Sequence, residues 1–438
     1  MKGAARRQIY LSSESKGSMT QQLGEIHYSY VFAEDGFKRA LQSLNYEPNI
    51  LGMPEIYNDL SALPRPNGAE ISPVHISFRS TENIRLCRPT YNISAFAWEF
   101  TVMRQHTLFG DHPFDNQIHM LSLMDEVWAP SRFTQEIISA HGVENVHLVP
   151  SPIDLPVRTA PATAQERSAN FHRIGYRMVA RLWGNSRHSA MDRGQDLENT
   201  RSRMSATLGL AKAVEQGLLF LSIMNPHDMR KNVPSLIMGF NSFQSVHPDA
   251  ALIIKLNLPP DRTTTAMAID SILGKLAHPI SMRSPNIFLL IGYLETNELV
   301  SLYRASSFYL STALAEGQNL PLQEAMSQGV LAIAPRHTAM VDYIDDGGAV
   351  IIPHEMSPFL FPKVAANHAR APFEVAHSKP VDVCRALCSA VALDPQRRLD
   401  LADRGRKTVT DLYSIAAVAE KIQERLAVAE SVHAELAA

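Results

Sequence analysis

The chain has 438 residues, of which 45% are hydrophobic and 19% charged, and its formal net charge is −3. This composition is typical of a folded globular protein, so it excludes a disordered chain and a small disulfide-stapled one. So small a net charge does not indicate a nucleic-acid-binding protein, which normally carries a basic domain. The length allows about three average domains or two large α/β domains.

Two sequence features bear on the cellular compartment. The three cysteines are an odd and sparse set, which suits a reducing compartment. The N-terminus lacks the apolar run of a signal peptide, and no stretch reaches the ~18 uninterrupted apolar residues of a membrane span. We therefore expect a cytoplasmic protein, and we leave open a peripheral contact with the inner face of a membrane.

The N-terminal third alternates short apolar runs with helix-like segments. The spacing of apolar residues predicts helices over residues 34–44 and 114–124. Strands are predicted over residues 9–12, 74–78, 93–97, 126–129 and 146–149. Because alternating strands and helices are typical of a parallel sheet covered on both faces, we expect a doubly wound, Rossmann-like domain over residues 1–155.

An arginine-rich stretch follows over residues 160–205, with eight arginines against four acidic side chains and no clear periodicity. We interpret residues 156–214 as a polar insertion or interdomain connection. Such a stretch is either a solvated basic loop or a surface for anionic lipid headgroups or a phosphate-bearing acceptor, and the sequence leaves both readings open. The arginines are Arg167, Arg173, Arg177, Arg181, Arg187, Arg193, Arg201 and Arg203.

A second alternating series follows over residues 215–410, which we expect to form another doubly wound domain. Its predicted strands are 218–224, 251–256, 286–291, 308–311 and 330–334, and its predicted helices are 233–246, 296–305 and 321–328. The remaining segment, residues 411–438, contains a predicted helix over 415–436. Two doubly wound domains in tandem leave a crevice between them in which ligands bind.

The segment 315–329 carries the most informative pattern. Pro321 suits the first position of a helix, and Gly317 permits a close backbone approach or an unusual φ just before it. The free amides of residues 317–320 would then point out of a helix N-terminus, which favours an anion or a polar ligand. Glu316 and Glu324 flank this turn and could accept hydrogen bonds from sugar or ribose diols. Taken alone, the first could be a capping charge and the second a solvated helix carboxylate.

The same residues read E-G-x-x-L-P-L-x-E-A-M-x-x-G, with seven residues between the glutamates. This pattern resembles the E-x7-E signature of family 4 GT-B glycosyltransferases, the retaining enzymes related to glycogen synthase and sucrose-phosphate synthase. The resemblance implies a GT-B fold, in which two Rossmann-like domains face a cleft and bind a nucleotide-diphospho-sugar. It implies that Glu324 holds the donor ribose and that Glu316, with the backbone amides that follow it, holds the transferred sugar. The residues between them assigned to donor binding are Gly317, Gln318, Asn319 and Leu320.

A second segment, residues 220–232, is similar to the donor-phosphate loop of that family and carries its R-K-N variant. A basic pair at a helix N-terminus can stabilise the charge that grows on a leaving diphosphate without a metal ion. Lys231 and Arg230 are therefore assigned catalytic roles, although both could be ordinary surface charges. Asn225, which stands where many relatives have the arginine of a G-R-L triplet, is assigned to donor binding. Lys255, at the carboxyl end of a predicted strand, is a further candidate for donor binding.

The N-terminal half resembles the family at residues 97–100, 125–133 and 149–154, and it places Glu99 and His106 on the acceptor side. The segment 335–343 departs from the Gly-Gly-x-Pro-Glu turn that relatives often have. The resemblance implies that the last helix returns to the N-terminal domain, that no metal or cofactor is required, and that the acceptor is a glycan or lipid-linked glycan of polysaccharide biosynthesis. The alternative is a non-catalytic GT-B scaffold that binds carbohydrate or a partner subunit, and a phosphorylase is a third candidate.

Overall fold

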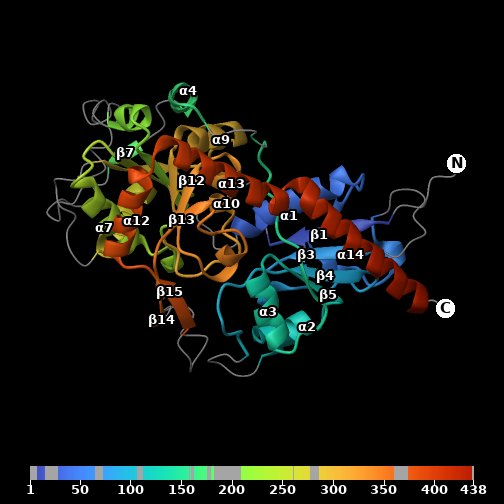
Figure 1. Ribbon diagram of the computed structural model, residues 1–438. Helices are drawn as coiled ribbons and strands as arrows, with labels where there is room; N and C mark the ends of the chain where they lie inside the picture. The colour runs from blue at the N-terminus through green and yellow to red at the C-terminus, as the bar shows by residue number, and fades with distance from the viewer. Residues whose placement is uncertain are drawn as a thin grey trace.

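The computed structural model describes residues 7–14, 28–64, 73–105, 112–156, 158, 162–174, 179–181, 209–259, 261–276, 286–359 and 373–436. Over these residues the chain forms two domains, each built around a central sheet. Figure 1 shows the domains side by side, the first coloured blue to cyan and the second green to orange.

The N-terminal sheet has six parallel strands in the order β2-β1-β3-β4-β5-β6. Alternate side chains of the central strands are apolar and form a core against a helix that precedes the second strand. The strands are β1 (Ile9–Ser13), β2 (Asn49–Ile50), β3 (Val74–Phe78), β4 (Tyr91–Ala95), β5 (Glu126–Ala129) and β6 (Val146–Leu148), and the helices are α1 (Tyr28–Ser43), α2 (Gln117–Ser122) and α3 (Arg132–Ala140).

The last helix, α14 (Ile415–Leu436), lies on this N-terminal domain. It packs beside α1, and its apolar side chains, among them Val418 and Ile422, enter the same core. Figure 1 shows it as the long red helix that crosses the blue domain. The chain passes between the domains twice, near Ile153 and near Tyr413. These two crossings are adjacent, and the Ile153 amide donates a hydrogen bond to the Tyr413 carbonyl at 2.7 Å. Closely spaced crossings of this kind suit a hinge.

The C-terminal sheet has the order β13-β12-β11-β8-β9-β10-β7. Six strands are parallel, and β7 pairs antiparallel at the edge. The strands are β7 (Val179–Arg181), β8 (Leu219–Met224), β9 (Ala251–Leu256), β10 (Ile287–Ile291), β11 (Phe308–Leu310), β12 (Leu331–Ala334) and β13 (Ala349–Ile351), with a separate hairpin of β14 (Glu355–Phe359) and β15 (Phe373–His377). The helices are α4 (Ala164–Ile174), α7 (Val233–Gln244), α8 (Arg262–Gly274), α9 (Thr296–Ala305), α10 (Leu320–Ser327), α12 (Pro380–Ala392) and α13 (Pro395–Tyr413).

Two expectations about local structure are corrected. The arginine-rich stretch is not irregular where it is described, because α4 packs on α9 and buries Ile174 in the core of the C-terminal domain. Its residues 160–161, 175–178 and 182–205 lie outside the described residues. The helix expected over 114–124 is short, because the Asn116 side chain accepts from the His119 amide and starts α2 at Gln117.

The carboxyl ends of strands from both sheets face the same interdomain space. The loops after β8, β11 and β12 contact the loop after β4 and the start of α3. Crossing contacts include a hydrogen bond from the Arg132 amide to Asp342 at 2.9 Å. In open α/β sheets this edge is where ligands bind, so the fold places any site here.

Candidate active site

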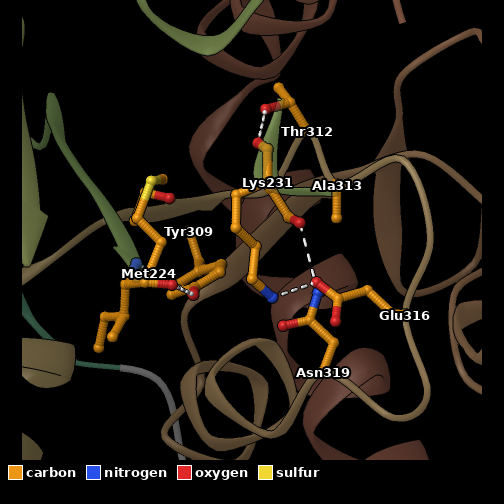
Figure 2. Close-up of a pocket in the computed structure, with 10 residues that line it drawn as sticks. Met224, Lys231, Tyr309, Thr312, Ala313, Glu316 and Asn319 are labelled. Carbon is orange, nitrogen blue, oxygen red and sulfur yellow. Dashed lines mark hydrogen bonds and ion pairs between the residues drawn. The ribbon is translucent and has the colours of Figure 1, made fainter. Parts of the chain in front are cut away.

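The loops after β8 and β11 enclose a small pocket at this edge. Its volume is about 10 Å³, enough for about one water molecule. Figure 2 shows the Lys231 ammonium pointing at the Glu316 carboxylate, with Asn319 beside them. The pocket is lined by Ser222, Ile223, Met224, Lys231, Tyr309, Ser311, Thr312, Ala313, Glu316 and Asn319.

The central contact is an ion pair between Lys231 and Glu316. The lysine Nζ lies 2.6 Å from Glu316 Oε1, and the glutamate side chain is only 6% exposed. Lys231 ends a short 3-10 turn, and its carbonyl accepts a hydrogen bond from the Thr312 hydroxyl at 3.0 Å. This hydrogen bond joins the loop after β8 to the loop after β11. The Lys231 and Glu316 side chains, one from each loop, are thereby held close together.

Arg230, the neighbouring residue, points to the opposite domain. It pairs with Asp228 at 2.7 Å and with Glu99 of the N-terminal loop. Burial alone would lower its pKa, but these two carboxylates, with Glu316 further off, raise the pKa of Arg230 above its ordinary value. The predicted catalytic cation and the predicted acceptor residue are therefore in direct contact across the domains.

The turn before α10 is held by the N-terminal domain as well as by its own. A Cβ on Gly317 would lie 3.2 Å from Ala97 Cβ, a tight contact that a larger residue could make only if the neighbouring chain moved slightly. The Gln318 side chain bonds to the backbone of Ser151 at 2.7 and 3.0 Å and points away from the pocket. Its predicted donor contact is therefore limited to its backbone amide. Leu320 begins the helix and does not line the pocket.

Glu324 lies one turn inside α10, beyond the pocket. Its Oε2 accepts a hydrogen bond from the buried Tyr303 hydroxyl at 2.7 Å, so it is not the solvated carboxylate that the motif alone allows. Burial raises the pKa of Glu324 to about 7, against the opposing effects of Tyr303 and Lys255. Burial likewise lowers the pKa of Lys255 to about 8. Burial therefore disfavours the charge on both groups, and the opposite charge of each partly offsets this effect on the other.

The structure thus brings together three of the predicted residues, Lys231, Glu316 and Asn319, in one pocket. Lys255 and Asn225 do not line it, and Asn225 instead caps the His227 amide at 3.0 Å. His106 lies outside the described residues. Among the described residues, no three His, Cys, Asp or Glu side chains gather as metal ligands.

Sequence reasoning missed the hydroxyl groups of the pocket. Ser311 and Thr312 directly follow the strand β11, and Tyr309 lies within it. The Tyr309 hydroxyl accepts from the Ile223 amide at 3.2 Å and so joins β11 to β8. Polar residues directly after a buried parallel strand were a usable signal, because such positions reach the ligand edge of the sheet.

No helix in the described part of the chain has both the length and the apolar character needed to cross a bilayer. No family model matches the chain, and no curated protein sequence matches it. The comparison with solved structures does give matches, all at low sequence identity.

The α,α-trehalose-phosphate synthase (UDP-forming) of Burkholderia vietnamiensis matches with a TM-score of 0.54 at 12% identity, over 98% of this chain and 100% of that one. The HepE protein of Anabaena, solved with UDP and glucose, matches with a TM-score of 0.52 at 11% identity, over 96% of this chain and 100% of that one. TarM of S. aureus matches with a TM-score of 0.47 at 11% identity over 80% of this chain, which spans 55% of TarM.

The first two matches confirm the predicted GT-B fold, two Rossmann-like sheets with six parallel strands each and helices on both faces. Membership of glycosyltransferase family 4 stays a prediction, because identities of this size carry the fold alone.

Proposed function

We propose that the chain is a glycosyltransferase that moves a sugar from a nucleotide-diphospho-sugar to a hydroxyl acceptor. The observation that carries the proposal is the meeting of Lys231, Glu316 and Asn319 in one pocket at the interdomain edge of a GT-B fold. The solved structures with the same fold support it, since HepE was solved with UDP and glucose and the Burkholderia enzyme is UDP-forming.

Donor cleavage leaves a nucleoside diphosphate whose negative charge grows in the transition state. The Lys231 side chain is 18% exposed and its ammonium group is held by Glu316, so it is positioned to donate to the leaving phosphate once the donor has bound. Arg230 is the second cation, and its planar guanidinium suits two phosphate oxygens. Two positioned cations can stabilise the leaving group without a metal ion.

Glu316 positions the donor sugar in this proposal and does not attack it. Its carboxylate can accept sugar hydroxyls, while the amides of residues 317–320 face the same turn. Glu324, held by Tyr303, accepts the ribose hydroxyls of the nucleotide. The transfer proceeds with retention of configuration, and the departing diphosphate takes the proton of the acceptor hydroxyl.

The acceptor enters from the N-terminal domain beside Glu99, which lies across the cleft from the donor cations. A carboxylate there can accept a hydrogen bond from a hydroxyl once Arg230 turns to the diphosphate. We propose a glycan or a lipid-linked glycan as the acceptor, which places the chain in polysaccharide biosynthesis with a peripheral membrane contact.

The described pocket at Lys231 is too small for a donor, so we infer that the cleft opens when the donor binds. Ligand pockets have volumes of about 300–1,000 Å³, whereas the pocket at Lys231 holds about 10 Å³. Among the described residues, the contacts across the cleft include several polar pairs and an apolar cluster around Phe100, Leu314 and Val375. Such an interface permits the domain motion that admits a substrate and then excludes water.

The test begins with thermal stability in the presence of UDP-, GDP- and ADP-sugars, because a ligand that binds only the folded state raises the melting temperature. Sugar transfer to hydroxyl acceptors is then followed by mass spectrometry for the donor that stabilises. The proposal fails if no nucleotide sugar stabilises the chain, an outcome that favours the carbohydrate-binding scaffold. Product formation that depends on inorganic phosphate would instead identify a phosphorylase.

A further inference from the structure

Thr338 has a backbone conformation that its residue type disfavours. Its φ is +45°, in the left-handed region, where a β-branched side chain is a real outlier. It follows the extended residue His337 in the loop after β12 and begins a short 3-10 turn. A strained residue of this kind persists only where its surroundings hold it, and such residues gather at functional sites.

The strained residue holds the backbone of Glu316. The Thr338 Oγ1 accepts a hydrogen bond from the Glu316 amide at 3.0 Å. The next residue, Ala339, donates its amide to the Glu316 carbonyl at 3.3 Å. Both backbone groups of the glutamate are thus bound by two consecutive residues of another loop.

His337 fixes the orientation of the threonine hydroxyl. Its Nε2 lies 2.8 Å from the Ala313 carbonyl, which can only accept, so this nitrogen carries the ring proton. The ring is 5% exposed, and burial lowers the pKa of His337 to about 3, so it is neutral. Its Nδ1, 3.1 Å from Thr338 Oγ1, must therefore accept the threonine proton. The lone pairs of Oγ1 are then left for the Glu316 amide.

We propose that His337 and Thr338 are positioning residues for Glu316, through one directed chain of hydrogen bonds from the Glu316 amide to the Ala313 carbonyl. The chain joins both ends of the turn 313–316 and so keeps the Glu316 carboxylate on Lys231, where the donor sugar is to bind. This inference rests on the proposed function for its effect on turnover. The hydrogen bonds themselves do not depend on it.

The loop after β12 has a threonine at position 338, where the positive φ would favour a glycine. A glycine adopts positive φ without strain, but it has no side chain to accept the Glu316 amide. Threonine gives up that backbone freedom and supplies the hydroxyl.

The first test compares Thr338→Val, which keeps the branched shape without the hydroxyl, with Thr338→Ser, which keeps the hydroxyl. We expect Thr338→Val to lower kcat about tenfold, the effect of one lost hydrogen bond at a positioned group. Nucleotide affinity should stay unchanged, because Glu324 lies elsewhere. Thr338→Ser should stay close to the wild-type kcat. Thr410→Val is the matched control, since its buried hydroxyl has no partner among the described residues.

The second test does not need activity. Hydrogen exchange of the Glu316 amide should be faster in Thr338→Val and unchanged in Thr338→Ser and Thr410→Val. The ¹⁵N chemical shifts of His337 should show a neutral ring protonated at Nε2. If the wild-type chain transfers no sugar, the proposed function fails, and these two measurements still decide the positioning role. Wild-type exchange and kcat in Thr338→Val would overturn the inference, and so would an equal loss of kcat in Thr338→Ser.

Discussion

Glu99 of the N-terminal domain forms an ion pair with Arg230 of the C-terminal domain, directly beside the ion pair of Lys231 with Glu316. Each cation proposed to bind the donor diphosphate is therefore occupied by a carboxylate of the protein. A diphosphate carries comparable charge and offers oxygens to both cations. We therefore expect donor binding to exchange anions at Arg230, so that Glu99 is released toward the acceptor side when the donor is in place.

The exchange predicts that Glu99→Gln raises the affinity for UDP. The diphosphate no longer has to displace the Glu99 carboxylate from Arg230, although the ion pair of Arg230 with Asp228 remains. For a partly exposed pair the gain in affinity should be about fivefold, or about 1 kcal/mol. Sugar transfer should fall in the same variant, because the neutral amide oxygen of glutamine is a weaker hydrogen-bond acceptor for the substrate hydroxyl than the carboxylate is. Isothermal titration calorimetry and initial rates measure the two effects. Glu82→Gln, which breaks an ion pair within the N-terminal domain, is the control. Weaker UDP binding in Glu99→Gln would contradict the exchange.

Lys231→Ala should lower turnover far more than it lowers stability. Removal of one preorganised donor to a developing charge typically lowers kcat by about 10²–10³. The variant also leaves the buried Glu316 carboxylate without its cation, so the free energy of unfolding should fall by about 2 kcal/mol.

The double variant Lys231→Ala with Glu316→Gln separates the two effects. It should regain stability in urea denaturation, because no unpaired charge remains, but it should not regain turnover. Lys212→Ala, which breaks an exposed pair with Asp249, is the control. If Lys231→Ala transfers sugar at the wild-type rate, the assignment of the site is wrong.

The sequence was sufficient to predict most of the fold, because buried parallel strands are nearly continuous apolar runs. The strand over 251–256 and the helix over 415–436 have the predicted bounds. The helix α4 was missed, since its side chains are mostly polar and its packing on α9 does not show as an apolar periodicity in the sequence.

The candidate site could be predicted only in part, because only some of its residues belong to motifs that are local in the sequence. Glu316 and Lys231 stand in local motifs that a sequence displays. The direction of the Gln318 side chain and the hydrogen bond from the Glu316 amide to Thr338 join residues of separate loops, and only the folded chain shows them.

Donor affinity should depend on pH through Glu324. Burial raises the pKa of this carboxyl to about 7, and only its ionised form can accept two ribose hydroxyls. The affinity for UDP should therefore reach a plateau above about pH 8 and fall about tenfold per unit well below pH 7. Calorimetry from pH 5.5 to 8.5 measures this. The variant Glu324→Gln should bind UDP more weakly at pH 8. Any pH dependence of UDP affinity that this variant keeps should come from the nucleotide alone. An identical profile in both proteins would exclude Glu324 as the titrating group.

A second pH effect concerns stability and comes from His75, far from the donor pocket. Its Nε2 lies 2.8 Å from the Ser12 hydroxyl and its Nδ1 3.0 Å from Asn92 Oδ1, and the ring is fully buried. The amide oxygen can only accept, so Nδ1 carries the proton and Nε2 accepts from the serine. A second ring proton would break the bond to Ser12, and burial lowers the pKa of His75 to about 4.

The pH dependence of the free energy of unfolding depends on how His75 is protonated in the folded and the unfolded chain. Between about pH 6.5 and pH 4 the unfolded chain binds a proton at His75 and the folded chain does not, so the free energy of unfolding falls as the pH falls through this range. The loss from this residue should reach about 3 kcal/mol, and it should be complete near pH 4. Urea denaturation at pH 7.5, 6.0 and 5.0 measures it. His75→Gln should be less stable than the wild type at pH 7.5 but should lose less stability on acidification. Equal slopes for the two proteins would show that other groups, such as the buried His337, cause the acid sensitivity.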